Sequence, residues 1–253
     1  MSQHPHSTHA PTGAPSETPP LDLRERGGVK EGQPQFSDRR LFMALNAYTG
    51  CRDPKPLADA LARCGLDCVL YEEVNDPLGV AVLSMTDAPA QFLEKLRPAL
   101  QSPAFAALTP KPEFTMLGRT YSLGYEPKLE DWLLHRPRRV TLDPATPWAV
   151  WYPLRRSGAF SRLPRPEQQE ILKEHGIIGR RFGDAGHALD VRLACHGLDK
   201  NDNDFVIGLL GKELAPLSQL VETMRPTVQT STYLTNLGPF FVGRAVWRSP
   251  LGA

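Results

Sequence analysis

Hydrophobic residues follow two regular patterns in the first half of the chain, from about residue 40 onward. In some segments they alternate with polar residues, which is typical of half-buried strands, and in others they return every three or four residues, which is typical of amphipathic helices. These patterns predict strands at 41–50, 66–74, 79–86 and 114–126 and helices at 56–65 and 88–100. The resulting order, β-α-β-β-α-β, is that of a ferredoxin-like unit.

The same order returns in the second half of the chain. Strands are predicted at 148–154, 189–195, 204–210 and 238–247, and helices at 167–179 and 214–226. We therefore expect an α+β fold with two ferredoxin-like repeats, over 37–126 and 148–253, whose sheets join into one extended sheet or a dimeric α+β barrel with the helices outside. Residues 127–147 contain Pro137, Pro144 and Pro147 and are interpreted as a linker.

The first 36 residues differ from the rest of the chain. They are rich in Pro, Ser, Thr and His and contain few large apolar side chains, so they cannot bury enough surface to offset the chain entropy. We expect this segment to be a disordered tail in which His4, His6 and His9 are solvated. It lacks the apolar stretch of a secretory signal.

Composition excludes several classes of partner. The net charge of +1 gives no reason to expect nucleic acid or an anionic membrane. No apolar run reaches the roughly 18 residues that a membrane helix needs.

The cysteines Cys51, Cys64, Cys68 and Cys195 form no CxxC pair, and the spacing of Cys64 and Cys68 is interpreted as a helix end followed by a strand. We expect free thiols in a reducing compartment, which favours a cytoplasmic location.

One histidine stands out in the predicted helix that starts at Glu167. Ile171, Leu172, His175 and Ile178 share one apolar stripe, and Gly176 and Gly179 are expected to mark the end of the helix. By itself, an imidazole on a buried face is more often a core histidine that bonds a carbonyl than a ligand.

Four segments change that interpretation: LKEHGIIGR at 172–180, GLDKNDNDF at 197–205, ETMRPTVQTSTYL at 222–234 and GPFFVGR at 238–244. They resemble the chlorite dismutase superfamily, which includes the coproheme decarboxylases, and the resemblance is best between Trp151 and Arg244. It implies a dimeric ferredoxin-like fold with heme in the C-terminal half and His175 as the proximal ligand of the iron. The family also suggests a homo-oligomeric ring, often a pentamer.

A heme site also needs apolar walls and cations for the propionates. Apolar surface is expected from Ile171, Ile178, Leu189, Leu193, Val206, Ile207 and Leu220. Arg225, Arg156 and Arg139 are the candidate propionate partners, because a guanidinium binds a carboxylate bidentately. A solvated surface residue is the alternative for each, and for Arg139 it is the favoured one.

The resemblance also implies a distal residue on the strand that follows the proximal helix. Counting back from the GLD turn places Asp190 there, and Arg192 lies two residues on and faces the same side. We favour Arg192, whose guanidinium can stabilise a developing oxyanion, and keep Asp190 as the alternative that could move a proton. A salt bridge inside the barrel is the alternative for both. His196 is interpreted as structural and directed away from the heme face.

The segment WYPLRR distinguishes branches of the family. Tyr152 matches the redox-active tyrosine of coproheme decarboxylases, but Arg156 replaces a lysine that assists there, and an arginine does not readily release a proton. Phe160 and Ser161 stand where chlorite dismutases carry paired tryptophans. The position of the carboxylate that bonds their proximal histidine falls near Pro226.

The resemblance and these departures lead to one expected function. We expect a heme-binding oxidoreductase that uses heme b or coproheme and a small oxidant for peroxide-type chemistry. The alternatives are a coproheme decarboxylase of heme biosynthesis, a non-catalytic heme carrier or sensor, and a scaffold without heme.

Overall fold

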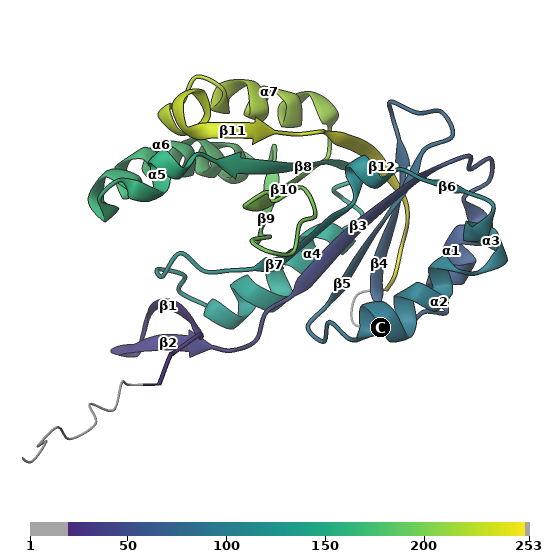
Figure 1. The fold of residues 1–253 in the computed structure, drawn as a ribbon, viewed down its shortest axis with the longest axis horizontal. Helices are drawn as coiled ribbons and strands as arrows, with labels where there is room; N and C mark the ends of the chain where they lie inside the picture. The colour runs from purple at the N-terminus through teal and green to yellow at the C-terminus, as the bar shows by residue number, and fades with distance from the viewer. Residues whose placement is uncertain (1–19, 251–253) are drawn as a thin grey trace, which may run out of the picture.

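The computed structural model describes residues 20–250, which form a ten-stranded antiparallel sheet with helices packed against it (Figure 1). This arrangement confirms the predicted α+β fold. The predictions for residues 1–19, including the histidines of the tail, lie outside the described residues.

The first half of the chain contributes the predicted strands and helices and several short elements that were not predicted. Its strands in the large sheet are β3 (Phe42–Thr49), β4 (Asp67–Glu73), β5 (Val80–Thr86), β6 (Thr109–Pro110) and β7 (Met116–Thr120). Its helices are α1 (Lys55–Ala62), η1 (Phe92–Leu96), α2 (Arg97–Leu100), α3 (Pro103–Ala106) and η2 (Pro112–Phe114).

The second half follows the same order with two additions near its end. Its strands are β8 (Trp148–Arg156), β9 (Leu189–Ala194), β10 (Phe205–Gly211), β11 (Leu234–Leu237) and β12 (Phe241–Arg248). Its helices are α5 (Gly158–Arg162), α6 (Arg165–Asp184), α7 (Leu214–Met224) and η4 (Gln229–Tyr233). The short helix α5, which precedes α6, and the short strand β11 and helix η4 near the end of this half were not predicted.

Strands from the two halves pair directly with each other, β7 with β9 and β4 with β12. Within the second half, β8 pairs with both β12 and β10, so the sheet closes on itself. Alternate side chains of its strands fill the interior, where Met43, Tyr71, Leu83, Trp151 and Phe241 are almost fully buried. The other set of side chains faces the helices, α1 to α3 on the first half and α6 and α7 on the second (Figure 1).

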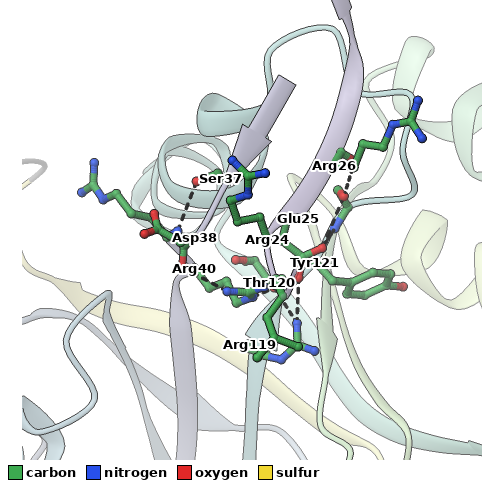
Figure 2. A network of polar contacts seen from close by, with 12 residues as sticks. Arg24, Glu25, Arg26, Ser37, Asp38, Arg40, Arg119, Thr120 and Tyr121 are labelled. Carbon is green, nitrogen blue, oxygen red and sulfur yellow. Dashed lines mark hydrogen bonds and ion pairs between the residues drawn. The ribbon is translucent and has the colours of Figure 1, made fainter. Parts of the chain in front are cut away.

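The disorder predicted for residues 1–36 was wrong for the last part of that segment. Residues 25–37 form a hairpin of β1 (Glu25–Lys30) and β2 (Gln33–Ser37). Figure 2 shows the reason: the Glu25 carboxylate accepts from Arg40 Nε at 2.9 Å and Arg119 Nη1 at 3.0 Å, which ties the hairpin to β7. Composition does not reveal such a contact, because one of its partners, Arg119, lies 94 positions further along the chain.

The irregular linker predicted over 127–147 was also wrong. This segment forms η3 (Asp131–His135) and α4 (Arg136–Leu142), and Leu133, Leu134 and Leu142 are buried in the interior core. Pro137 lies in the first turn of α4, where a proline has no hydrogen bond to lose and does not break a helix.

Helix α6 differs from its prediction in length and in burial. It runs on to Asp184 through Gly176 and Gly179, whose backbone stays helical. Its apolar stripe, which includes Ile171, His175 and Ile178, is half-buried, and no residue of the helix is fully buried.

Candidate functional site

His175 lies on α6 and is held by two threonines of the segment that follows α7. Its Nδ1 is 3.1 Å from Thr227 Oγ1 and its Nε2 is 3.3 Å from Thr230 Oγ1. Burial lowers the pKa of His175 to about 4; the charge of Glu174 opposes this shift and that of Arg156 adds to it. The imidazole is therefore neutral at physiological pH.

The hydrogen bonds of Thr227 indicate which nitrogen carries the proton. Thr227 Oγ1 donates to the carbonyl of Met224 at 2.7 Å, and a hydroxyl has only one proton to give. Thr227 therefore accepts from Nδ1–H of His175, and Nε2 keeps its lone pair. A neutral imidazole whose Nε2 carries no proton is the form that binds a metal. Here the Thr230 hydroxyl faces this nitrogen at 3.3 Å and would have to turn aside for a metal to bind.

A row across three strands brings the predicted catalytic side chains together. Ile207 of β10 is paired with Tyr152 of β8 on one side and with Arg192 of β9 on the other. Residues directly opposite in an antiparallel pair point to the same face, so Tyr152 and Arg192 share a face with one strand between them, about 10 Å apart at the backbone.

Helices α6 and α7 cover this face. Ile178 and Phe182 of α6 and Leu217 and Leu220 of α7 pack in one cluster with Tyr152 and its neighbours on β8. Burial raises the pKa of Tyr152, and the charge of Asp190 adds to the increase. The phenol stacks on Phe240 with 4.7 Å between ring centroids. The face that carries Tyr152 and Arg192 is thus the one toward which His175 and its helix pack.

Asp190 and Arg192 form an ion pair on this outer face, not inside the barrel. Arg192 Nε lies 2.9 Å from Asp190 Oδ2, and both side chains are about one-third exposed. Arg136 of α4 binds the other carboxylate oxygen at 3.1 Å and the Asp190 carbonyl at 2.7 Å. The guanidinium carbon of Arg136 lies 4.8 Å from the ring centroid of Trp132, and that of Arg192 lies 5.0 Å from it. No sequence pattern pointed to Arg136 or Trp132, because their segment was interpreted as a linker.

Arg156 is a half-buried cation that forms no salt bridge with another side chain of residues 20–250, although the charge of Asp204 acts on it. Its guanidinium carbon lies 4.8 Å from the Phe160 ring centroid and 4.5 Å from that of Phe205. Its Nε is buried without a hydrogen-bond partner, and burial lowers its pKa. A half-buried guanidinium with an unsatisfied Nε, whose charge also acts on His175, is a favourable place for a carboxylate of a bound molecule.

The two other candidate arginines differ in their surroundings. Arg225 follows α7, is exposed, and forms no ion pair within the described part of the chain; its charge acts to lower the pKa of Tyr152. Arg139 is not brought to this group. It is exposed on α4 and binds Asp131 bidentately at 2.6 and 3.1 Å, so its guanidinium is already occupied.

Three further predictions about this face need correction. Leu193 and Val206 belong to the interior core and not to the apolar walls of the site. The expectation that His196 points away was wrong, because its ring lies 5.2 Å from the Phe205 ring, and the strand partners of Phe205, Ala194 and Leu154, place it on the outer face. His196 Nδ1 also lies 3.3 Å from Asp204 Oδ1, which supports a structural role.

Together these residues fit the requirements of an iron porphyrin. His175 offers a neutral nitrogen ligand, apolar side chains of α6, α7 and β8 pack around Tyr152, and Arg156 Nε has no hydrogen-bond partner among residues 20–250. Within the described residues, no cluster of three His, Cys, Asp or Glu side chains offers an alternative metal site. No helix in that part of the chain is long and apolar enough to cross a membrane.

Comparison with solved structures identifies the fold. A structure described as a novel heme-binding protein from Thermus thermophilus matches with a TM-score of 0.65 at 18% identity, over 83% of this chain and 92% of that one. Chlorite dismutase from Candidatus Nitrospira defluvii, in complex with imidazole, matches with a TM-score of 0.64 at 13% identity, over 85% and 93% of the two chains. At these identities the likeness establishes the fold.

The family follows from the sequence itself. The family model for chlorite dismutase matches residues 84–246, which span most of the chain and include β8, α6, β9 and α7. This protein therefore belongs to the chlorite dismutase family.

Proposed function

We propose that this protein is a heme-binding oxidoreductase with peroxide-type chemistry at an iron bound by His175. The observation that carries the proposal is a neutral, half-buried imidazole whose hydrogen bond to Thr227 leaves Nε2 unprotonated, on the same side of the sheet as Arg156, whose Nε has no hydrogen-bond partner among residues 20–250. The known relatives by fold include a heme-binding protein and a chlorite dismutase, which supports the same class of cofactor.

Each residue has a distinct task in this proposal. His175 binds the iron through Nε2, and Thr227 holds the ring by accepting from Nδ1–H. Arg156 and the exposed Arg225 bind the porphyrin carboxylates, which would give the Arg156 Nε the hydrogen-bond partner that it lacks among residues 20–250. When bound, the heme supplies the redox chemistry between a small oxidant and an electron donor.

Arg192 binds the oxidant on the distal side. Its guanidinium is oriented by the ion pair with Asp190 and by the Trp132 ring, so its remaining N–H groups are held in place for an anion. Both oxygens of Asp190 are engaged by arginines, which favours a positioning role for this carboxylate over a proton-transfer role.

Peroxide turnover tests the proposal. The heme-loaded protein should oxidise a simple electron donor with hydrogen peroxide faster than free hemin does. Arg192→Ala should slow this turnover by roughly 10²–10³ if the guanidinium acts as an oxyanion donor. Arg139→Ala is the matched control, because Arg139 pairs with Asp131 and should leave turnover unchanged. Turnover no faster than that of free hemin would contradict an enzymatic role and favour a heme carrier or sensor.

A second candidate, coproheme decarboxylase, is favoured by the place of Tyr152. Its buried ring lies on the outer face, and both Tyr152 and Arg192 are paired with Ile207. A tyrosine that relays a radical to a bound porphyrin would need to lie on this face. Arg156 can bind the same propionate but cannot release a proton as a lysine could. We expect slow conversion of coproheme to heme b with hydrogen peroxide. Rapid loss of two carboxyl groups, abolished by Tyr152→Phe, would identify a decarboxylase.

A further inference from the structure

Two thiols in the first half of the chain lie in contact, on a different part of the barrel from His175. Cys64 Sγ is 3.9 Å from Cys68 Sγ. Cys64 follows helix α1 and is half-buried, whereas Cys68 is in β4 and fully buried. Both belong to the cluster around Leu57, Leu61 and Phe105, which is separate from the cluster around Tyr152.

The turn between helix and strand creates this contact. Gly65 has a φ of +66°, a conformation that glycine adopts at low cost, and it reverses the chain after α1 so that Cys64 lies over β4. The sequence spacing alone suggested only a helix end followed by a strand. It is the left-handed turn that converts this spacing into a pair of neighbouring sulfurs.

We propose that Cys64 and Cys68 form a dithiol that a hydroperoxide oxidises to an intramolecular disulfide. The Cys64 thiolate attacks one peroxide oxygen, the O–O bond breaks, and the departing oxygen takes a proton to leave as water or an alcohol. The resulting Cys64 sulfenic acid is attacked by the Cys68 sulfur, the S–O bond breaks, and the hydroxyl leaves with the Cys68 proton as water. One peroxide is reduced by two electrons and two thiols become one disulfide.

The thiols of Cys64 and Cys68 differ in pKa and in exposure, and the proposed steps require both differences. The hydrogen bond with Cys68 lowers the pKa of Cys64 to about 7, and the positive charge of Lys95 contributes. The pKa of Cys68 is raised well above its usual value by the same neighbour and by burial. Cys64 is thus the accessible nucleophile, and Cys68 is shielded until a sulfenic acid forms beside it.

The remaining cysteines lack these features. Cys195 is buried in the barrel wall, its Sγ donates to the Asn203 carbonyl at 3.1 Å, and burial raises its pKa to about 12. Cys51 is also buried, and its pKa is raised by burial.

Closure to a disulfide requires a movement of Cys64 and not of Cys68. A disulfide is about 2.0 Å long, so the sulfurs must approach from their present 3.9 Å contact. The backbone of Cys68 is fixed by Ser249, which accepts from Cys68 N through Oγ at 2.9 Å and donates its own N–H to the Cys68 carbonyl at 2.9 Å. Cys64 is half-buried and follows a short helix, whereas Cys68 is fully buried within a strand, so rotation of the Cys64 side chain is the smaller movement.

The sequence allows a direct test on the full chain. Trypsin should release one peptide from Cys64 to Lys95, which contains both thiols and no other cysteine. The protein is exposed briefly to hydrogen peroxide and then unfolded in the presence of an alkylating agent, so that the buried thiols can also react. The peptide should then be lighter by two hydrogen atoms and carry no alkyl group. Dithiothreitol should restore both thiols. The peptides with Cys51 and Cys195 should remain alkylated.

Variants separate the two steps and exclude the heme. Cys68→Ser should leave a Cys64 sulfenic acid that dimedone traps, and Cys64→Ser should remain unoxidised at Cys68. His175→Ala, which removes the proposed iron ligand, should form the disulfide as the wild type does, so failure of the heme proposal would not affect this result. Two alkylatable thiols after peroxide treatment, or over-oxidation of Cys64 beside a free Cys68, would overturn the proposal.

Discussion

The Thr227 hydroxyl lies 3.1 Å from Nδ1 of His175 and donates its own proton to the Met224 carbonyl at 2.7 Å. A neutral hydroxyl therefore occupies the place, next to Pro226, where the resemblance to chlorite dismutases would require a carboxylate. The hydroxyl fixes the tautomer and the orientation of the ring but adds no negative charge. An iron bound by this histidine should be less electron-rich than one bound by a histidine paired with a carboxylate.

Replacing Thr227 tests this arrangement. Thr227→Ala should lower heme affinity by about 10-fold, because partners of this kind typically contribute 10- to 100-fold. Thr227→Ser keeps the hydroxyl and should retain wild-type affinity. Absorbance titration with hemin measures the affinity, and the iron–histidine stretch in resonance Raman spectra reports the bond directly. Equal affinities and equal stretches in the three proteins would show that the hydroxyl does not position the ligand.

Asp190 orients Arg192, so substitution of either residue should weaken anion binding. Asp190→Asn removes the partner at 2.9 Å and should lower the affinity of the heme-loaded protein for fluoride by about fivefold, the value of a partly exposed ion pair. Arg192→Ala should lower this affinity further. Fluoride titration of the ferric protein provides both numbers. A loss of affinity confined to the Asp190 variant would identify the carboxylate as the distal group.

How far the sequence determines the site is clearest on β8, β9 and β10. Alternation of apolar and polar residues places Asp190 and Arg192 on one side of a strand, and the structure pairs them there. The predictions that were wrong for other segments have different causes. Pro137 was interpreted as a helix breaker although it lies in the first turn of α4, and Gly176 was interpreted as a helix end although its backbone is helical.

Tertiary contacts account for the rest. Arg136 reaches Asp190 from a helix 54 residues earlier in the chain, and no local pattern predicts such a pair. The hairpin that begins at Glu25 also depends on contacts that no local pattern predicts. Its polar strands are held in place by ion pairs of Glu25 with Arg40 and Arg119 and not by apolar burial.

Gly208 is required by the size of the Trp151 ring inside the barrel. The two residues are strand partners, and a Cβ at Gly208 would lie 2.5 Å from the ring carbon Cη2 of Trp151. Gly208→Ala should therefore destabilise the fold by about 2 kcal/mol through overpacking. Gly158→Ala is the control, since its Cβ would meet nothing within 4 Å. Urea unfolding compares them, and equal midpoints would contradict this packing.

The reactivity of Cys64 should depend on pH through its neighbour. The thiolate fraction rises with pH, so the alkylation rate of Cys64 should reach half its plateau near the pKa of about 7. Cys68→Ala removes the largest cause of the lowered pKa and should move this midpoint upward, whereas Cys51→Ala should leave it in place. Timed alkylation and mass analysis of the tryptic peptides give the midpoints. A midpoint that Cys68→Ala does not move would rule out the thiol contact as its cause.

The central claim, that His175 binds heme iron, is tested most directly by the absorption spectrum of the hemin-reconstituted full chain. His187→Ala serves as the control, because His187 is exposed. Wild type and His187→Ala should give the Soret maximum of a histidine-ligated ferric heme. His175→Ala should fold and lose this maximum. An unchanged Soret band in His175→Ala would contradict the account and move the search for the ligand to the other histidines.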